Sequence, residues 1–555
     1  MPKRPVILLG VYALVVLPLA GWGCGSTRET NPQPQITAPP SLPAEDCHPL
    51  PGIPQPGGTI VFALAETVDP IHAPVPHNVS ERLVFRNLYE TLVRVDCEGR
   101  LQPGLADSWT SHEGDRIWVF TLRPGAYFWD GTRVLPRDVK DSWIAAESCP
   151  RTEGDHSPLI WLNARAESVQ VMDERRLAIH LPEPQYDFPL LLAHAALAVA
   201  VIRPGWQWPV GSGSCRLEPE TGPPDPDVVC LPNQHYPRPP VWDQLVFRQL
   251  PDEDPRDILG HRCDALIVRD QSTLNYFRRT AAVTITPLPW DRLYLLLCPP
   301  DRPEEDRQRW YTGWQRGNLA RDVVGADALP TREPYFQLPT EKLCPQLTGP
   351  IATVRGASSE WEAVSTTFEE DMILHPADDA DARRLAERLA VLAAQPRATT
   401  EDQPGRGPLS RPYPPGGGQV PQAVAVPRDQ FLAAIQSERA GAYVLPVDRC
   451  YASACLQLSA LLSMSAWLQQ VGLDVSFTDT YHPPSARPHN ELENQDLAQV
   501  VLVSRQLAAS GAAVPMVVTR ANLVARGRLA GLRFAYDGTI LLDQAGWYAN
   551  AGSTP

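Results

Sequence analysis

The sequence predicts an α/β protein made of more than one domain. The apolar segment 58–64 has the length and composition of a buried strand, and in residues 80–93 apolar side chains recur at helical spacing. Strand-like and helix-like segments alternate again between residues 241 and 297, which favours a sheet covered by helices. A chain of 555 residues that is 43% hydrophobic and 20% charged can fill several cores and is too weakly charged to be disordered.

The elements between and after these stretches follow from local signals. Short strands are expected at 107–110 and 117–122, and a helix begins near Leu135. Two hairpins follow, one at 169–181 and one that contains Cys215 and Cys230. The alternating stretch then predicts strand 241–250, helix 254–260, strand 265–268, helix 272–279 and strand 283–297.

The N-terminus has the layout of an export signal. Lys3 and Arg4 precede an apolar run from Val6 to Ala20, and small residues lead to Cys24. Cys24 resembles the lipid-modified cysteine of bacterial lipoproteins, so we expect residues 1–23 to be a signal peptide and Cys24 to hold a membrane-anchoring lipid. An uncleaved anchor and simple secretion are the alternatives, because about 18 apolar residues is near the lower limit for a membrane span.

Two segments are too rich in proline and small polar residues to bury a core. Residues 24–56 predict an extended tether. Residues 397–421 predict a mobile surface loop inserted between a helix ending near Ala394 and a strand at 423–426.

Composition and motifs exclude several functions. The net charge is -15, and only three of the basic residues are lysine, so a nucleic-acid-binding surface is not expected. No HExxH, Walker, GxGxxG or GxSxG motif is present, and His72 and His77 lie in a proline-rich loop. We therefore expect no enzyme, no cofactor and no metal site. A hydrolase whose triad assembles only in space is the third-ranked alternative.

The cysteines are expected to form structural disulfides. Without Cys24 the chain has ten, an even number in an exported protein, and none has the spacing of a zinc site. Cys215 and Cys230 stand on the two arms of one predicted hairpin, where a bridge can form. We therefore predict a disulfide between them.

An ordered series of motifs carries a family resemblance. The chain contains GGTIVFALAETVDP, followed by RNLYETLVRVDCEGRLQPGLADSWTSHEGDRIWVFTLRPGAYFWDGTRVLPRDVKDSW. These segments resemble the first part of family 5 extracellular solute-binding proteins, the oligopeptide- and dipeptide-binding subunits of bacterial ABC importers. PVGSGSCRLEP and AAVPMVVTRANLVARGRLAGLRFAYDGTILLDQAGW are similar to later parts of that family. The family's Asp-Arg-Glu is absent from RWYTGWQRGNLARDVVG.

The resemblance implies a periplasmic-binding-protein-like α/β fold (type II, cluster C-like), in which two α/β lobes are joined by two hinge strands and ligand is enclosed between the lobes. It places lobe I in residues 57–72, 155–290 and 501–547, and lobe II in residues 291–500. An extra α+β subdomain is expected at residues 73–154.

The resemblance also suggests residues that line the cleft. In peptide-binding relatives an acidic residue near the hinge holds the ligand's ammonium, because a buried cation must be paired. Asp448 is the candidate here, and its alternative roles are an ion pair with Arg449 and a surface carboxylate. The other candidates are Glu66, Trp208, Ser212, Arg449 and Tyr451, for which the alternatives are a loop cap for Glu66, a core position for Trp208 and a turn for Ser212.

The resemblance implies an extracytoplasmic receptor, in the periplasm or on the outer face of the membrane. It would be a monomer that closes two lobes on a peptide or similar small polar solute and delivers it to an ABC permease. The alternative is a family-derived envelope lipoprotein that no longer transports and acts as a ligand sensor or interaction protein.

Overall fold

The computed structural model describes residues 53–97, 99–147, 168–182, 184–219, 227–299, 323–325, 327–331, 372–393, 421–437, 441–465, 467–468, 503, 507 and 510–548. The chain divides into two compact units, residues 1–35 and 36–555, and all these ranges belong to the second. The predicted signal peptide, Cys24 and almost all of the insertion 397–421 lie outside the described residues. No helix among the described residues is long and apolar enough to span a membrane.

An eleven-stranded mixed sheet forms the centre of the second unit. Its strands run in the order β15-β14-β16-β12-β17-β11-β1-β10-β9-β8, and β13 pairs with β17 outside that path. The strands are β1 (Thr59–Leu64), β8 (Cys215–Arg216), β9 (Val228–Pro232), β10 (Gln244–Gln249), β11 (Ala265–Val268), β12 (Val283–Leu297), β13 (Ala328–Pro330), β14 (Met372–Pro376), β15 (Gln422–Val426), β16 (Ala442–Asp448) and β17 (Ala513–Arg526).

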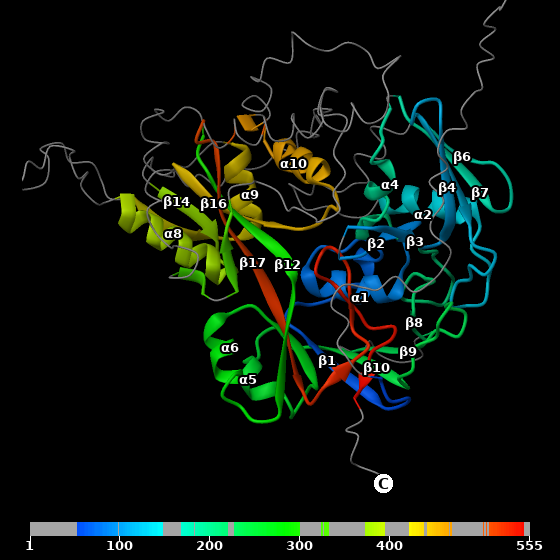
Figure 1. The fold of residues 1–555 in the computed structure, drawn as a ribbon, viewed down its shortest axis with the longest axis horizontal. Coiled ribbons are helices and arrows are strands. Elements are labelled where there is room, and N and C mark those ends of the chain that lie inside the picture. The colour runs from blue at the N-terminus through cyan, green and yellow to red at the C-terminus, as the bar shows by residue number, and fades with distance from the viewer. Residues whose placement is uncertain are drawn as a thin grey trace, which may run out of the picture. The chain divides into compact units, whose positions relative to one another are not determined.

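Two long antiparallel strands connect the halves of this sheet. β12 has 15 residues and β17 has 14, and Figure 1 shows them side by side. Near one end, β17 also pairs with β11, and near the other, β12 also pairs with β16. Their mutual register shifts between Pro287 and Trp290 and again between Trp290 and Arg292. These are the two crossing strands that the family resemblance implies.

The half that contains β14 and β16 is covered on both faces. Successive side chains of a strand point to opposite faces, so Leu293 and Leu295 of β12 enter one core cluster while Tyr294 and Leu296 enter another. The first cluster packs against α9 (Arg428–Gln436) and α10 (Ala454–Ser463), and the second packs against α8 (Ala380–Ala393). The uninterrupted apolar run of β12 follows from this double burial.

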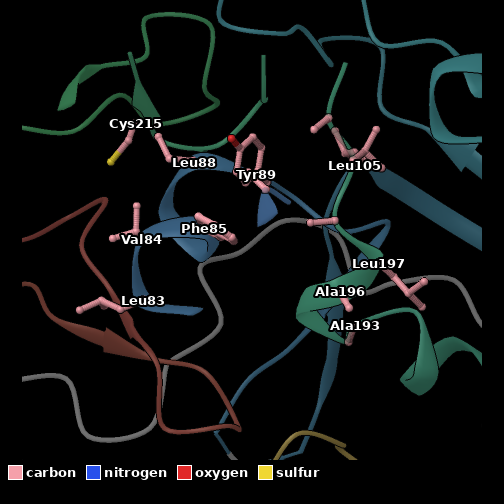
Figure 2. Packing of buried hydrophobic residues seen from close by; sticks show 14 of the residues in the cluster. Leu83, Val84, Phe85, Leu88, Tyr89, Leu105, Ala193, Ala196, Leu197 and Cys215 are labelled. Atoms are coloured by element: carbon pink, nitrogen blue, oxygen red, sulfur yellow. The ribbon is translucent and has the colours of Figure 1, made fainter. Parts of the chain in front are cut away.

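The half that contains β1 and β11 has the same construction. Ala63 of β1 packs in a cluster with α5 (Pro255–Ile258) and α6 (Gln271–Phe277), whereas Phe62 faces the largest core. That core includes α1 (Val79–Leu88) and η2 (Ala195–Leu197), parts of which are visible in Figure 2. Asn78 caps α1 by accepting a hydrogen bond from the Glu81 amide at 2.8 Å.

Helix α1 is shorter than its apolar spacing predicts. The helical pattern continues to residue 93, but the helix ends at Leu88 and Tyr89 is already extended. The residues beyond it include Thr91 and Val93, whose β-branched side chains favour strands, and β2 (Val93–Val95) begins there. Strand pairing with β3 (Leu101–Pro103) therefore takes over from the helix.

A separate four-stranded sheet forms the α+β segment, in the order β4-β5-β7-β6. Both strands of the hairpin predicted at 169–181 belong to it, so this sheet continues past residue 154, the end predicted for the subdomain. Its strands are β4 (Ala106–His112), β5 (Ile117–Leu122), β6 (Ser168–Val171) and β7 (Arg176–His180). The remaining elements are η1 (Pro70–His72), α2 (Pro136–Glu147), α4 (Phe188–Leu191), β18 (Leu529–Ala530), β19 (Arg533–Phe534), β20 (Ile540–Leu541) and β21 (Gly546–Trp547).

Candidate functional site

Asp448, the candidate ligand anchor, is held by two arginines. It is the last residue of β16 and lies opposite Arg292 of β12 in the sheet register, so their side chains meet across the strands. The Arg292 Nε lies 2.7 Å from Asp448 Oδ1, and Arg82 Nη2 of α1 lies 3.7 Å from Oδ2. Burial alone would raise the pKa of Asp448, but the two guanidinium groups outweigh it and hold that pKa well below its usual value.

The ion-pair network continues from Arg292 into the half of the sheet that contains β14. Arg292 Nη1 donates to Asp379 at 2.9 Å, and the Tyr294 hydroxyl donates to the same carboxylate at 2.9 Å. Asp379 also accepts the backbone N–H of Ala382 in the first turn of α8. Every oxygen of this buried carboxylate therefore has a donor, which is the condition for keeping a charge inside a protein.

Two arginines on one face of α1 point toward the same region. Arg82 and Arg86 are four residues apart, so they lie one above the other on the helix. Arg82 Nη1 lies 3.5 Å from the Cys450 sulfur, and Arg86 Nη2 lies 3.0 Å from Asp537 Oδ2. Burial would raise the pKa of Asp537, yet Arg86 and then Arg82 lower it.

The segment after β16 packs against the half that contains α1. The Tyr451 ring lies 4.8 Å from the ring of His194, and the Ser453 hydroxyl donates to Asp187 Oδ2 at 3.2 Å. Tyr451 and Ala452 are buried in the same core cluster as α1 and η2. In this structure the two halves are thus joined by packing and polar contacts next to the Arg82–Asp448 pair.

His194 is kept neutral in this contact. Burial, and after it the positive charges of Arg86 and Arg82, lower its pKa to about 3. Its Nδ1 accepts the N–H of Ala196 at 3.1 Å and caps η2, so the ring is fixed in orientation.

Three other candidates lie around α1. Glu66 Oε2 accepts the N–H of Ser80 while Ser80 Oγ accepts the N–H of Glu66, both at 3.1 Å, so Glu66 caps the start of the helix. Trp208 is 7% exposed and packs edge-on against Phe85. Ser212 is 1% exposed, and its hydroxyl makes no hydrogen bond to a described residue. A role for any of them in ligand contact stays a prediction.

Arg449 is 5% exposed, and its Nη1 donates to the backbone oxygen of Trp290 at 3.4 Å. The ion pair that the sequence suggests between Asp448 and its neighbour Arg449 is replaced by the pairs with Arg292 and Arg82. Asp448 lies opposite Arg292 in the β12–β16 register, which is why it pairs with Arg292 across the sheet.

Cys215 and Cys230 are buried free thiols in the structure. They are close, since Cys230 shares a side-chain hydrogen bond with Cys215, but Cys215 lies opposite Pro232 in the hairpin register and Cys230 is its diagonal neighbour. Figure 2 places Cys215 near the end of α1. Cys97, by contrast, is disulfide-bonded. The Cys215–Cys230 bridge stays a prediction.

The sequence reasoning missed Arg82, Arg292 and His194. A signal for Arg82 and Arg86 was present, because both fall within an apolar helical segment, where a buried cation needs a carboxylate partner. Arg292 and His194 gave no such signal. Within the described ranges, no group of three or more His, Cys, Asp or Glu residues is arranged to hold a metal ion.

Known proteins resemble this chain in sequence and in fold. Residues 100–265 match the model of "Bacterial extracellular solute-binding proteins, family 5 Middle". The periplasmic murein peptide-binding protein MppA of Escherichia coli K12 is 31% identical over 185 residues, which are 29% of this chain and 32% of the relative. The periplasmic oligopeptide-binding protein OppA of the same strain is 27% identical over 154 residues, 24% of this chain and 28% of the relative. The sequence matches thus span about a third of these relatives.

Solved structures match over much more of the chain. The Escherichia coli murein tripeptide binding protein MppA aligns with a TM-score of 0.62 at 15% identity, over 90% of this chain and 100% of that one. A dipeptide binding protein from Pseudoalteromonas sp. SM9913, in complex with Met-Leu, aligns with a TM-score of 0.61 at 14% identity, over 88% of this chain and 100% of that one. The predicted fold class and the predicted resemblance to family 5 solute-binding proteins are confirmed.

Proposed function

From this resemblance to the family 5 extracellular solute-binding proteins, we propose that the chain is the extracytoplasmic receptor of an ABC importer and binds a peptide or similar small polar solute between two closing lobes. The observation that supports it most is the match of residues 100–265 to the family model within a fold that aligns over about nine tenths of the chain. Binding without catalytic turnover is part of the proposal.

The hinge of this receptor would be the middle of β12 and β17. Both strands belong to both halves of the sheet, and their register is interrupted twice between Pro287 and Arg292. An interrupted ladder bends more readily than a continuous one. A solute that contacts both lobes would then shift the open and closed populations by its difference in affinity for the two.

A peptide's ammonium would have to compete with Arg292 and Arg82 for Asp448. Arg292 lies at 2.7 Å and would stay, since the sheet register fixes it, whereas Arg82 lies at 3.7 Å and comes from the other half. We propose that an incoming ammonium displaces Arg82. If so, the Asp448→Asn variant loses about 2–5 kcal/mol of affinity for a peptide with a free N-terminus. An N-acetylated peptide binds both proteins equally.

The test of binding uses the purified full-length mature chain. Native mass spectrometry identifies any solute retained from the host, and a panel of di- to pentapeptides is then screened by melting temperature and by X-ray scattering. Binding raises the melting temperature by linkage, and closure reduces the radius of gyration. If no retained solute is found and no peptide produces either change, the receptor proposal is wrong.

A pair of variants tests whether Arg82 competes with the ligand's ammonium for Asp448. Arg82→Gln removes the guanidinium that the ammonium has to displace and is expected to strengthen binding of a peptide with a free N-terminus. Arg116→Gln, at an exposed position, is the matched control and leaves affinity unchanged. Equal affinities for the two variants would show that Arg82 does not compete for Asp448.

The proposal places the receptor outside the cytoplasmic membrane and anchors it by lipid on Cys24. The charged start, apolar run and small residues before Cys24 support it, as does the periplasmic location of the matched relatives. Intact-mass measurement of the membrane-extracted protein checks it. Retention of Lys3 or an unmodified Cys24 would contradict the anchor.

A second candidate is a non-transporting lipoprotein that senses a ligand. The observation that favours it is the double ion pair of Asp448, which already satisfies the carboxylate expected to anchor a solute. Uptake of a labelled peptide that binds the purified protein separates the two candidates. A deletion strain loses uptake if the chain is a receptor and keeps it if the chain is only a sensor.

A further inference from the structure

A small polar cavity lies at the C-terminal end of α1, apart from Asp448. Its volume is about 50 Å³, and it is bounded by the end of α1, by β2, by the turn before β8 and by the β19–β20 hairpin. Small-molecule sites usually measure ~300–1,000 Å³, so this cavity is far too small for a peptide. It can hold a group of a few heavy atoms.

The carboxylates that line this cavity are already neutralised. Glu90 is held by Arg123, with its two oxygens at 3.0 and 2.7 Å from the guanidinium. Asp543 makes a bidentate pair with Arg533, whose Nε and Nη2 lie 3.2 and 2.5 Å from the two carboxylate oxygens. Paired geometry of this kind is the strongest form of the arginine–carboxylate interaction, so neither carboxylate is available to another cation.

Arg94 adds a positive charge that no described carboxylate balances. It lines the cavity from β2, and its Nε donates to the backbone oxygen of Pro103 at 3.0 Å. Within the described part of the chain, no carboxylate lies within ion-pair distance of its guanidinium. With Arg86 paired to Asp537, the charged groups among the described lining residues, taken with the partners printed for them, leave one net positive charge, that of Arg94.

Tyr236 contributes a second donor. It lines the cavity from the loop after β9. Burial, followed by the charge of Asp543, raises the pKa of Tyr236 to about 12. The hydroxyl therefore keeps its proton at physiological pH and can donate it to an acceptor.

The geometry points to a binding site for a small oxyanion, held by the Arg94 guanidinium and the Tyr236 hydroxyl. The site offers one uncompensated cation and one neutral donor, and its carboxylates are occupied. An oxyanion accepts both hydrogen bonds and balances the charge, whereas water accepts them without balancing it. Inorganic phosphate, sulfate and a free carboxylate such as acetate share this chemistry.

Such an ion would join parts of the chain that are distant in sequence. Arg94 comes from β2 and Tyr236 from the loop after β9, and the β19–β20 hairpin forms another wall. A ligand that binds only the folded state stabilises it according to its concentration and dissociation constant. The oxyanion would therefore act as a structural ligand, separate from the solute.

The test measures anion binding to the full chain at constant ionic strength. Sodium phosphate, sodium sulfate and sodium acetate are titrated against sodium chloride by calorimetry and by melting temperature. We expect saturable binding of at least one oxyanion, with a rise in melting temperature, and at least a tenfold loss of affinity in Arg94→Gln. The order of the three anions shows whether the site prefers a tetrahedral or a planar group.

Matched variants keep this test decisive. Tyr236→Phe removes only the hydroxyl and is expected to weaken binding several-fold, so it tests the site even if Arg94→Gln fails to fold. Arg116→Gln and Tyr276→Phe, at exposed positions, keep full affinity. Absence of saturable binding in the unmodified chain, or equal affinity in the site and control variants, would overturn the proposal. Neither result bears on solute binding, which is measured with peptides.

Discussion

Replacing Asp448 by asparagine tests the ion pairs between β16, β12 and α1. The substitution keeps the size of the side chain and removes its charge, so Arg292 loses a partner at 2.7 Å and Arg82 loses one at 3.7 Å. All three side chains are less than one fifth exposed. Solvent therefore compensates poorly for the lost charge.

The expected loss of stability follows from the remaining partners. Removing one member of a buried ion pair costs ~3–5 kcal/mol, because the other charge is left uncompensated. Arg292 still contacts Asp379 at 2.9 Å, and Arg82 still lies beside Cys450. We therefore expect a loss at the lower end of the range, about 3 kcal/mol.

Urea denaturation of the unmodified chain and of Asp448→Asn at pH 7 measures this loss as the difference between their free energies of unfolding. The dependence of that free energy on urea concentration should be equal in the two proteins. Asp378→Asn is the matched control, because Asp378 pairs with Arg428 at 3.5 Å with both side chains about half exposed. Such an exposed pair contributes less than ~1 kcal/mol. If Asp448→Asn is no more destabilising than Asp378→Asn, the buried network does not stabilise the fold and the reasoning is refuted.

The same variant has a predictable pH dependence. The folded-state pKa of Asp448 is lowered, so its contribution is complete above the unfolded-state value of ~3.9 and is lost as the pH falls through the folded-state value. The difference in stability between the unmodified chain and Asp448→Asn should therefore be constant near neutrality and shrink below about pH 4.

Three further predictions concern other parts of the structure. Gly213→Ala should destabilise the fold by about 1–3 kcal/mol, because a Cβ there would lie 2.4 Å from the backbone oxygen of Asn87. Gly125→Ala, with open space around it, should be nearly neutral in the same urea assay. His194→Asn keeps a cap for η2 but cannot titrate. Because the folded-state pKa of His194 is lowered, the unmodified chain should lose stability relative to the variant as the pH falls from about 6.5 to 3. Parallel curves of unfolding free energy against pH would contradict this. Non-reducing peptide mapping of protein from an oxidising compartment should find Cys215 bridged to Cys230, with a contribution of roughly 3 kcal/mol on the loop-entropy model, and pairing of either cysteine elsewhere would exclude the bridge.

Much of the fold could be predicted because its signals are local. The apolar run at 293–297 has the composition of a strand buried on both faces, and it forms the end of β12 between two helical layers. The helical spacing at 80–93 identified α1 but not its end. Strand pairing of β2 with β3 decides that end, and such pairing depends on residues outside the segment.

The candidate site was harder to predict because its contacts are not local. Asp448 meets Arg292 only through the β12–β16 register, and it meets Arg82 only because α1 comes from the other half of the sheet. A sequence shows which carboxylate follows a strand, but not which arginine lies across from it. The resemblance therefore pointed to Asp448 and gave no indication of its partners.

The position of β17 has a consequence for how the chain reaches its folded state. This strand lies between β12 and β11 near the middle of the sheet, yet it is formed by residues 513–526. Neither half can complete its hydrogen-bonded ladder until that late segment has arrived, and pairings between residues so far apart in sequence form slowly. A nascent chain stopped before residue 513 would leave β11 and β12 with open edges, which are sites for aggregation and for recognition by proteases.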